Sequence, residues 1–442
     1  MNFINYSNIN NQSFYKIFVF IIFSLLPISL VLGNLAININ IIFADLSLIF
    51  YSIKHNDWKW TKGKFFKLLI IIQFYLIVSS INSIFFITNY EFFDANHKHA
   101  LYNGLYRSLG FLKYILLVFS LSLISKFNIK LDNLIKGWSI IIFIILFDVF
   151  FEKIFGNNIL GNVSPDSSRI ISFFGDEMIV GSYLLLFGFI ISSYWLDKKN
   201  MKYSYKIFFN FLIILIPFAV FVSGEKSNFI KSFICFSTLI YFIPRDKLVI
   251  GRKKLIFILI AALLSLFYFN DYTRIKYTET IKRANILGDN ERFLDFQYNI
   301  KYFDHYDVAW KIFKDNPVLG VGNKNFRWEC SRPKYFDKKR IWTLARCAPH
   351  PHQVHFELLS EQGLLGYILI MSIILNFIIR ISINSYKKNE IFKFSMSLYL
   401  IVFLIPLLPG GGIFSTYSGS NFWLVVALLN YLNNDEIRKR IN

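Results

Sequence analysis

Three histidines and two glutamates lie close together in the stretch CAPHPHQVHFELLSEQGLLG, residues 347–366. They are His350, His352, His355, Glu357 and Glu361. A neutral imidazole can accept a proton from a hydroxyl group, which is the task of a general base. The same residue types can bind a metal ion, or can serve as polar groups where an apolar helix meets water. The stretch therefore admits a catalytic, a metal-binding and a structural interpretation.

The spacing argues against a metal site. His352 and His355 are three positions apart, which matches neither an HExxH nor a paired CxxC pattern, and the surrounding segment is strongly cationic. Pro351 disfavours helical geometry at the residue before it and suits a first helical turn. We therefore expect His352 at the outer mouth of the following helix, where it is the candidate base, and a structural role stays open as the alternative.

The two glutamates follow on the same expected helix. Glu357 and Glu361 are four positions apart and share one face. A carboxylate at membrane depth is costly, so we expect both to face the protein interior or a wet cavity.

Two cations interrupt stretches that are otherwise poor in charge. Arg169 ends the loop VSPDSSR and Lys226 lies in VSGEKSNF, each at one end of an apolar run. A cation at such a boundary can neutralise a diphosphate, and arginine can do so with two parallel hydrogen bonds. The alternative is a side chain that anchors a helix end by reaching towards the interface.

The elements that must position these residues are membrane helices. Hydrophobic residues make up 55% of the 442 positions, and apolar runs of membrane-spanning length recur along the chain. The sequence predicts an all-α polytopic membrane protein with about twelve transmembrane helices, and the first helix is expected to be retained and not cleaved as a signal peptide. The expected spans are residues 14–33, 35–53, 67–87, 104–125, 137–155, 170–195, 207–223, 227–243, 254–270, 356–380, 394–409 and 419–433.

The short loops predict the orientation. With both termini in the cytoplasm, the Lys/Arg-rich loops all fall on the cytoplasmic side, as the positive-inside rule requires. Topology then explains most of the net charge of +20, and a nucleic-acid partner loses its support. The chain divides into transmembrane helices 1–9 at residues 1–270, a large periplasmic loop with short helices at 271–355, and transmembrane helices 10–12 with a cytoplasmic tail at 356–442.

The large loop contains two further features. Its segment HYDVAWKIFKDNPVLGVG predicts an amphipathic helix that stops before Pro317 and turns through Gly320 and Gly322. The turn has no GK[ST] ending and follows no strand, so it is not a nucleotide site. Cys330 and Cys347 would close a loop of about 17 residues if oxidised, a constraint of about 3 kcal/mol, and two free thiols are the alternative.

These scattered motifs resemble the O-antigen polymerase and O-antigen ligase family of bacterial envelope glycosyltransferases. NPVLGVGNKNF followed by HPHQVHFELLSEQGLLGY is similar to that family's GxGxxxF and HxHNxxLexlxExGxxG signature. SSRIISFFGDEMIVGSYLLL and SGEKSNF resemble two of its cation-bearing segments. Gln353, His355 and Lys226 stand where Asn, Tyr and Arg are usual, and the lysine keeps the charge without the bidentate fork.

The resemblance implies glycosyl transfer from a polyprenyl-diphosphate-linked donor to a saccharide hydroxyl on the periplasmic face of the bacterial inner membrane, without a cofactor or a metal. His352 would be the base and Arg169 and Lys226 the diphosphate contacts. His350, His355, Glu357, Glu361, Gly320 and Gly322 would have supporting roles, and a chain-length regulator protein is a further candidate partner. Asp148, Glu152 and Asp176 are secondary candidates for binding sugar hydroxyls, with helix packing as the alternative.

The leading hypothesis is a polymerase that lengthens a lipid-linked glycan. Its reaction needs charge stabilisation on the departing phosphate, a base for the incoming hydroxyl, and alignment of the two. The runner-up is a ligase that transfers the glycan to lipid A core. A polysaccharide or lipid transporter, or flippase, is the alternative from another class, but no internal repeat is visible and the candidate groups gather at one face instead of the midplane.

Overall fold

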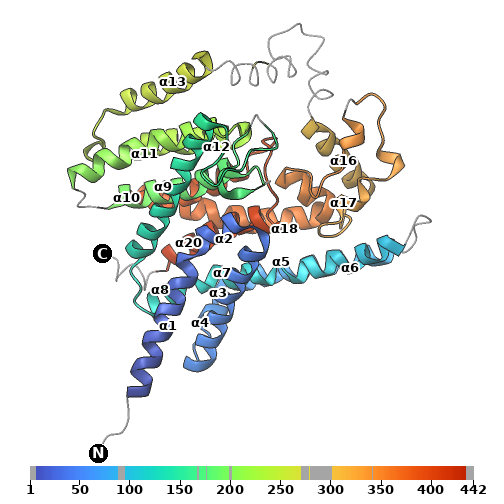
Figure 1. Ribbon diagram of the computed structural model, residues 1–442. Helices are drawn as coiled ribbons and strands as arrows, with labels where there is room; N and C mark the ends of the chain where they lie inside the picture. Colours follow the sequence, from blue (N-terminus) through green and yellow to red (C-terminus); the bar gives the residue numbers. More distant parts are fainter. Residues whose placement is uncertain are drawn as a thin grey trace, which may run out of the picture.

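The computed structural model describes residues 6–87, 95–166, 169–175, 177–198, 202–269, 278, 301–340 and 342–434. Within these ranges the regular structure is helical throughout, without a β-strand (Figure 1). The helices of the N-terminal part are α1 Tyr6–Ser24, α2 Leu26–Leu32, α3 Asn34–His55, α4 Lys59–Lys62, α5 Lys64–Ile87, α6 Ala95–Leu109, α7 Leu112–Ser120, α8 Ser122–Lys126 and α9 Leu131–Phe155.

The central and C-terminal parts continue the pattern. Their helices are η1 Ser172–Phe174, α10 Val180–Asp197, α11 Tyr203–Val222, α12 Lys226–Phe242, η2 Arg245–Lys247, α13 Arg252–Phe269, α16 Lys301–Asp315, α17 Phe326–Glu329, η4 Pro333–Tyr335, η5 Thr343–Ala345, α18 Val354–Lys387, α19 Ile391–Phe403 and α20 Thr416–Leu432. Every range expected to be a span contains a helix, so the prediction of an all-α polytopic protein is confirmed.

Seven helices in the described part of the chain are long and apolar enough to cross a membrane, and the bent pair α1–α2 raises this to eight if it forms one span. The two halves of that pair meet at an angle of 46°. Pro27 lies in the first turn of α2, where its missing N–H leaves no additional donor unsatisfied. The protein is therefore a multi-pass membrane protein.

Charges inside two of the expected spans are accommodated by pairing and burial. On α3, Asp45 is buried. From α7, Lys113 donates to the Asn38 side chain with 2.6 Å between Nζ and Oδ1. Polar groups of this kind are tolerated at membrane depth when they face a neighbouring helix.

Helix α18 lies at the centre of the molecule and contacts α5, α16 and α19 (Figure 1). It is interrupted at Gly363, whose φ of 64° lies in the left-handed region. A break of this kind releases backbone groups that need new partners. A Cβ at Gly363 would collide with the Val318 carbonyl, so the backbone of another segment passes directly against the break.

That segment is the turn at residues 317–322. The N–H groups of Val321 and Gly322 donate to carbonyls of Ser360 and Glu361, at 3.0 and 2.8 Å between N and O. In the other direction, the N–H of Leu364 donates to the Pro317 carbonyl at 2.8 Å. The turn thus satisfies the backbone groups that the break in α18 releases.

The described part of the large loop has its own small core. Val308 and Ile312 of α16 pack with Phe326 of α17, and Cys330 and Cys347 form a disulfide with 5.4 Å between their Cα atoms. Helix α16 ends at Asp315, before Pro317, as the sequence predicts. Figure 1 shows α16 and α17 together on one side of α18.

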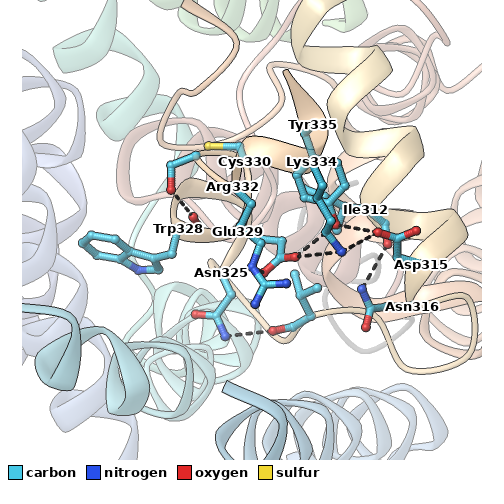
Figure 2. A network of polar contacts seen from close by, with 12 residues as sticks. Ile312, Asp315, Asn316, Asn325, Trp328, Glu329, Cys330, Arg332, Lys334 and Tyr335 are labelled. Atoms are coloured by element: carbon cyan, nitrogen blue, oxygen red, sulfur yellow. Dashed lines mark hydrogen bonds and ion pairs between the residues drawn. The ribbon is translucent and has the colours of Figure 1, made fainter. Parts of the chain in front are cut away.

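A polar network holds the far side of this core together (Figure 2). The Tyr335 hydroxyl oxygen lies 2.9 Å from Asp315 Oδ2 and 3.0 Å from Glu329 Oε1, and the two carboxylates share its single proton. Lys334 Nζ lies 2.6 Å from Asp315 Oδ2, and Arg332 Nε lies 3.1 Å from Glu329 Oε2. Every carboxylate in this network has a cation or hydroxyl as a partner.

Candidate active site

His352 lies in the short connection between the large loop and α18. Its φ of 58° places it in the left-handed region, which is uncommon for a residue with a Cβ. The helix begins at Val354, so Pro351 stands before it, and the expectation that Pro351 belongs to the first turn is wrong. Gln353 caps the helix instead: its Oε1 accepts from the N–H of His355 at 2.7 Å and of Phe356 at 3.1 Å.

Three histidine rings gather at this connection. The His352 ring lies 4.4 Å from that of His350 and 5.3 Å from that of His305, measured between centroids. Tyr302 lies 5.4 Å from His352 on the same side. Both Tyr302 and His305 come from α16, and our sequence reasoning missed them. The signal was present, since His305 is a histidine on the amphipathic helix predicted to precede the motif.

Burial keeps these imidazoles neutral. Burial, with smaller contributions from the neighbouring His350, His305 and Lys301, lowers the pKa of His352 to about 3, and Glu357 acts in the opposite direction. Burial, together with the charge of Lys324, likewise lowers the pKa of His350 to about 3. A neutral imidazole has a lone pair available, which is what a general base needs.

The third histidine of the motif has a different environment. His355 Nδ1 lies 3.0 Å from the Tyr367 hydroxyl and its Nε2 lies 2.8 Å from the Leu404 carbonyl. With both ring nitrogens engaged, His355 fixes the start of α18 against the end of α19. The structure therefore brings His350 and His352 together and directs His355 elsewhere.

The loop PGGG at residues 409–412, between α19 and α20, joins the histidine connection to α12. Gly410 N–H donates to the His352 carbonyl with 2.7 Å between N and O. The Pro409 carbonyl accepts from the Ser227 hydroxyl and, at 3.1 Å, from Lys231 Nζ. Ser227 directly follows Lys226, so the loop connects the N-terminal end of α12 with His352. The sequence contained this loop, but its composition gave no sign of that contact.

Arg169 lies beside the same end of α12. The N–H of the next residue, Ile170, donates to the Ser223 carbonyl at 3.2 Å, and the Arg169 charge acts on the carboxylate of Glu225. Glu225 in turn accepts from Gly181 N–H and from Asn228, so it holds the start of α10 to the start of α12. The loop that carries Arg169 thus meets the start of α12, where Lys226 lies.

The secondary acidic candidates support this loop. Asp148 accepts from Ile159 N–H at 2.8 Å and from the Ser172 hydroxyl at 2.5 Å. Glu152 accepts from the N–H of Ser172 at 2.7 Å. Both carboxylates of α9 are occupied by the segment that carries Arg169, which favours their packing role. Asp176 lies outside the described residues.

The two glutamates of α18 surround a buried lysine. Lys324 forms an ion pair with Glu357, and both side chains are almost fully buried. Glu361 accepts from the backbone N–H of Lys324 at 2.8 Å and of Phe326 at 3.3 Å. Gly412 approaches so closely that a Cβ there would collide with the Glu357 carboxylate.

Gly320 and Gly322 have structural reasons to be glycines. Their φ values are 68° and 88°, and a Cβ on Gly320 would collide with the backbone at Glu361. They let the turn reach α18 and thereby place Lys324 between Glu357 and Glu361. Among the described residues, no group of three or more His, Cys, Asp or Glu side chains is arranged to hold a metal ion.

An all-helical membrane protein that places neutral imidazoles beside cations has the groups needed for transfer from an anionic leaving group. Residues 210–371 match a family model described as O-Antigen ligase. The resemblance in the motifs of this range is thereby confirmed: residues 210–371 are a domain of the O-antigen ligase and polymerase type of membrane glycosyltransferase. The matched range includes Lys226, the glycine turn and the whole histidine motif. No curated protein matches the chain.

Proposed function

We propose that the protein is a polysaccharide polymerase that transfers a glycan from a polyprenyl-diphosphate-linked donor to a saccharide hydroxyl on the periplasmic face of the inner membrane. The observation that carries the proposal is the contact of the PGGG loop with both the His352 carbonyl and the N-terminal end of α12. It links a candidate base to the candidate contacts of an anionic leaving group.

Each group has a role in this reaction. Arg169 and Lys226 bind the diphosphate and stabilise the charge that develops on it as the bond between the anomeric carbon and the phosphate oxygen breaks. His352 accepts the proton of the acceptor hydroxyl as the new glycosidic bond forms. Attack from the face opposite the leaving group inverts the anomeric configuration. The reaction needs no cofactor and no metal.

Supporting residues fix the positions of these groups. Glu361, Gly320 and Gly322 hold the turn that carries Lys324, and Lys324 pairs with Glu357. The negative charge of Glu357 acts on His352, where it favours the imidazolium that forms during transfer. His350 lies against His352 and His355 anchors the beginning of α18.

The proposed topology has twelve spans with both termini in the cytoplasm. It divides the chain at residues 270 and 355, and puts the histidine motif, Arg169 and Lys226 on the periplasmic side. Helices in each of the expected ranges and the basic loops on one side support it. Labelling of single cysteines introduced near residues 130, 200 and 340 from either side of the membrane tests it, because the third must react from the outside and the first two must not.

Deleting the gene tests the reaction. A polymerase mutant leaves single capped repeats, because repeats are still transferred but no longer joined. Long chains that accumulate on the polyprenyl carrier would refute the polymerase. They would instead establish the ligase that transfers the glycan to lipid A core, a second candidate that the O-antigen ligase description of the matched family favours.

Purified protein in lipid vesicles gives a direct test of glycosyl transfer. With lipid-linked donor and acceptor, it should release polyprenyl diphosphate in step with the formation of longer glycans. Movement of the lipid-linked donor across the bilayer without release of polyprenyl diphosphate would contradict the proposal.

A further inference from the structure

Two further arginines take no part in the proposed reaction. Arg107 lies on α6 and Arg327 on α17, and neither guanidinium forms an ion pair with a described carboxylate. Arg107 Nε donates to Asn103 Oδ1 at 3.3 Å. Arg327 Nη2 donates to the Pro349 carbonyl at 3.2 Å, and its Nε is buried without a hydrogen-bond partner.

Close packing brings α6 against the segment that directly precedes α17. A Cβ on Gly104 of α6 would lie 3.0 Å from the Asn323 carbonyl oxygen and 3.2 Å from Asn325 Nδ2. Arg107 follows Gly104 by three positions, so it projects from the same face of α6. Arg327 follows Asn325 by two positions. The absence of a side chain at Gly104 thus lets α6 approach the segment that leads into Arg327.

The nearby carboxylates have other partners. Glu357 pairs with Lys324 through Oε1, and Glu361 accepts two backbone N–H groups. Arg327 is attracted by Glu361 and Glu357 at longer range and repelled by Arg107, but it forms an ion pair with neither glutamate. Two neighbouring cations without a carboxylate of their own repel each other, and a bound anion would replace this repulsion with attraction to both.

The position of the pair relative to the histidines indicates which anion. Arg327 binds the carbonyl of Pro349, which directly precedes His350. Arg169 and Lys226 are connected to His352 by a different element, the PGGG loop. Two groups of cations are thus linked to the histidine segment through separate contacts, whereas the donor diphosphate needs only one of them.

We propose that Arg107 and Arg327 form a second anion site, which binds an acidic group of the acceptor saccharide and so presents its hydroxyl to His352. This inference rests on the proposed glycosyl transfer. The shared ligand chemistry is a phosphate or carboxylate oxyanion, which the planar donors of arginine bind with two hydrogen bonds. The acidic group comes either from a phosphate that links the acceptor to its lipid or from an acidic sugar within it.

Steady-state kinetics in vesicles test the site. At saturating donor, Arg107→Ala and Arg327→Ala should each raise the KM for a phosphate-bearing acceptor about tenfold, with the KM for the donor and kcat within about twofold of wild type. Arg107→Lys and Arg327→Lys should recover part of the affinity, because the charge is restored without the fork. Lys339→Ala, which removes an exposed cation of the same loop, should leave both KM values unchanged.

Two acceptors identify the source of the anion. One carries a lipid phosphate and a neutral glycan, and the other carries an acidic sugar and no phosphate. The acceptor whose KM depends on the arginines contains the recognised group. An uncharged acceptor should show no dependence, and an equal effect on that acceptor would overturn the site.

The failure of this inference differs from the failure of the proposed function. Acceptor KM values that stay within about twofold of wild type in all the alanine variants, while wild type transfers glycan, overturn the second site alone. An equal rise in the KM for the donor also overturns it, because the arginines would then act on the donor. Absence of transfer by wild type would overturn the proposed function, and this inference with it.

Discussion

Two polar regions, one around Glu329 and one around the histidines, differ in how completely their groups are satisfied. Around Glu329, each carboxylate, cation and hydroxyl of the network drawn in Figure 2 has a partner within the small core of α16 and α17. Around the histidines, by contrast, His350 Nε2, Glu357 Oε2 and Arg327 Nε are buried without hydrogen-bond partners. Leaving such atoms unpaired costs about 1–3 kcal/mol each.

The difference separates a structural network from a candidate site. A network that serves only stability gains nothing from unpaired groups, so its members pair with one another, as they do around Glu329. A site for an anionic, hydroxyl-rich substrate must keep donors and acceptors for that substrate. These three unpaired atoms lie in the region where the proposed function needs them, and the following predictions test this contrast.

The largest expected effect comes from the candidate base. His352→Ala should reduce kcat about 10³-fold, because no other group then accepts the hydroxyl proton, while the protein remains folded in membranes. His55→Ala, at the exposed end of α3, is the matched control and should retain full activity. Turnover of lipid-linked donor is the measurement, and full activity of His352→Ala would remove this residue from the mechanism.

Next comes the buried ion pair. Glu357→Gln should destabilise the protein by about 3–5 kcal/mol, because it removes the direct ion-pair partner of the buried Lys324. Glu329→Gln should cost only about 1–2 kcal/mol, since Arg332 and Lys334 lie at a more accessible edge. Thermal unfolding in detergent measures both. A double variant, Glu357→Gln with Lys324→Met, should be more stable than Glu357→Gln alone, and a further loss would contradict the pairing.

The disulfide belongs to the satisfied region. Replacing Cys330 and Cys347 together by serine should lower stability by about 3 kcal/mol, the loop-closure value for about 17 residues. The turnover of the remaining folded protein should stay close to wild type, because neither sulfur touches the histidines. Unfolding midpoints and turnover per folded molecule are the two measurements. A large loss of turnover per folded molecule would mean that the small core of α16 and α17 is part of the candidate active site.

The smallest expected effect is a shift of the acid limb of the pH profile of kcat/KM to lower pH. His352 ionises in the unfolded chain near its ordinary pKa of 6.5, whereas burial lowers its folded pKa to about 3. Its contribution to stability is therefore fully present above pH 6.5 and is lost as the pH falls towards 3, because the unfolded chain binds the proton first. The base also remains neutral at pH 5, so the acid limb of kcat/KM should lie well below pH 6.5. A limb at 6.5 would place the catalytic imidazole in water.

Much of this arrangement was accessible from the sequence. Apolar runs predicted the helices, because membrane-spanning length is a property of single segments. The motif at residues 347–366 directed attention to His352, and the glycine turn was expected. The contacts of Lys324, Gly410 and His305 were not predicted. These contacts join segments that are distant in sequence, and local periodicity gives no information about which distant segments pack together. The expectation that Pro351 belongs to the first helical turn was wrong, because α18 begins only at Val354 and Gln353 supplies its cap.

The interruption of α18 at Gly363 has a consequence for biogenesis. The carbonyls of Ser360 and Glu361 find their partners in a turn that is synthesised about forty residues earlier. The first half of α18 therefore completes its backbone bonding only when this turn has folded against it. In the proposed topology, where the large loop is periplasmic, insertion of α18 and export of the loop become one coupled event, and the site assembles last.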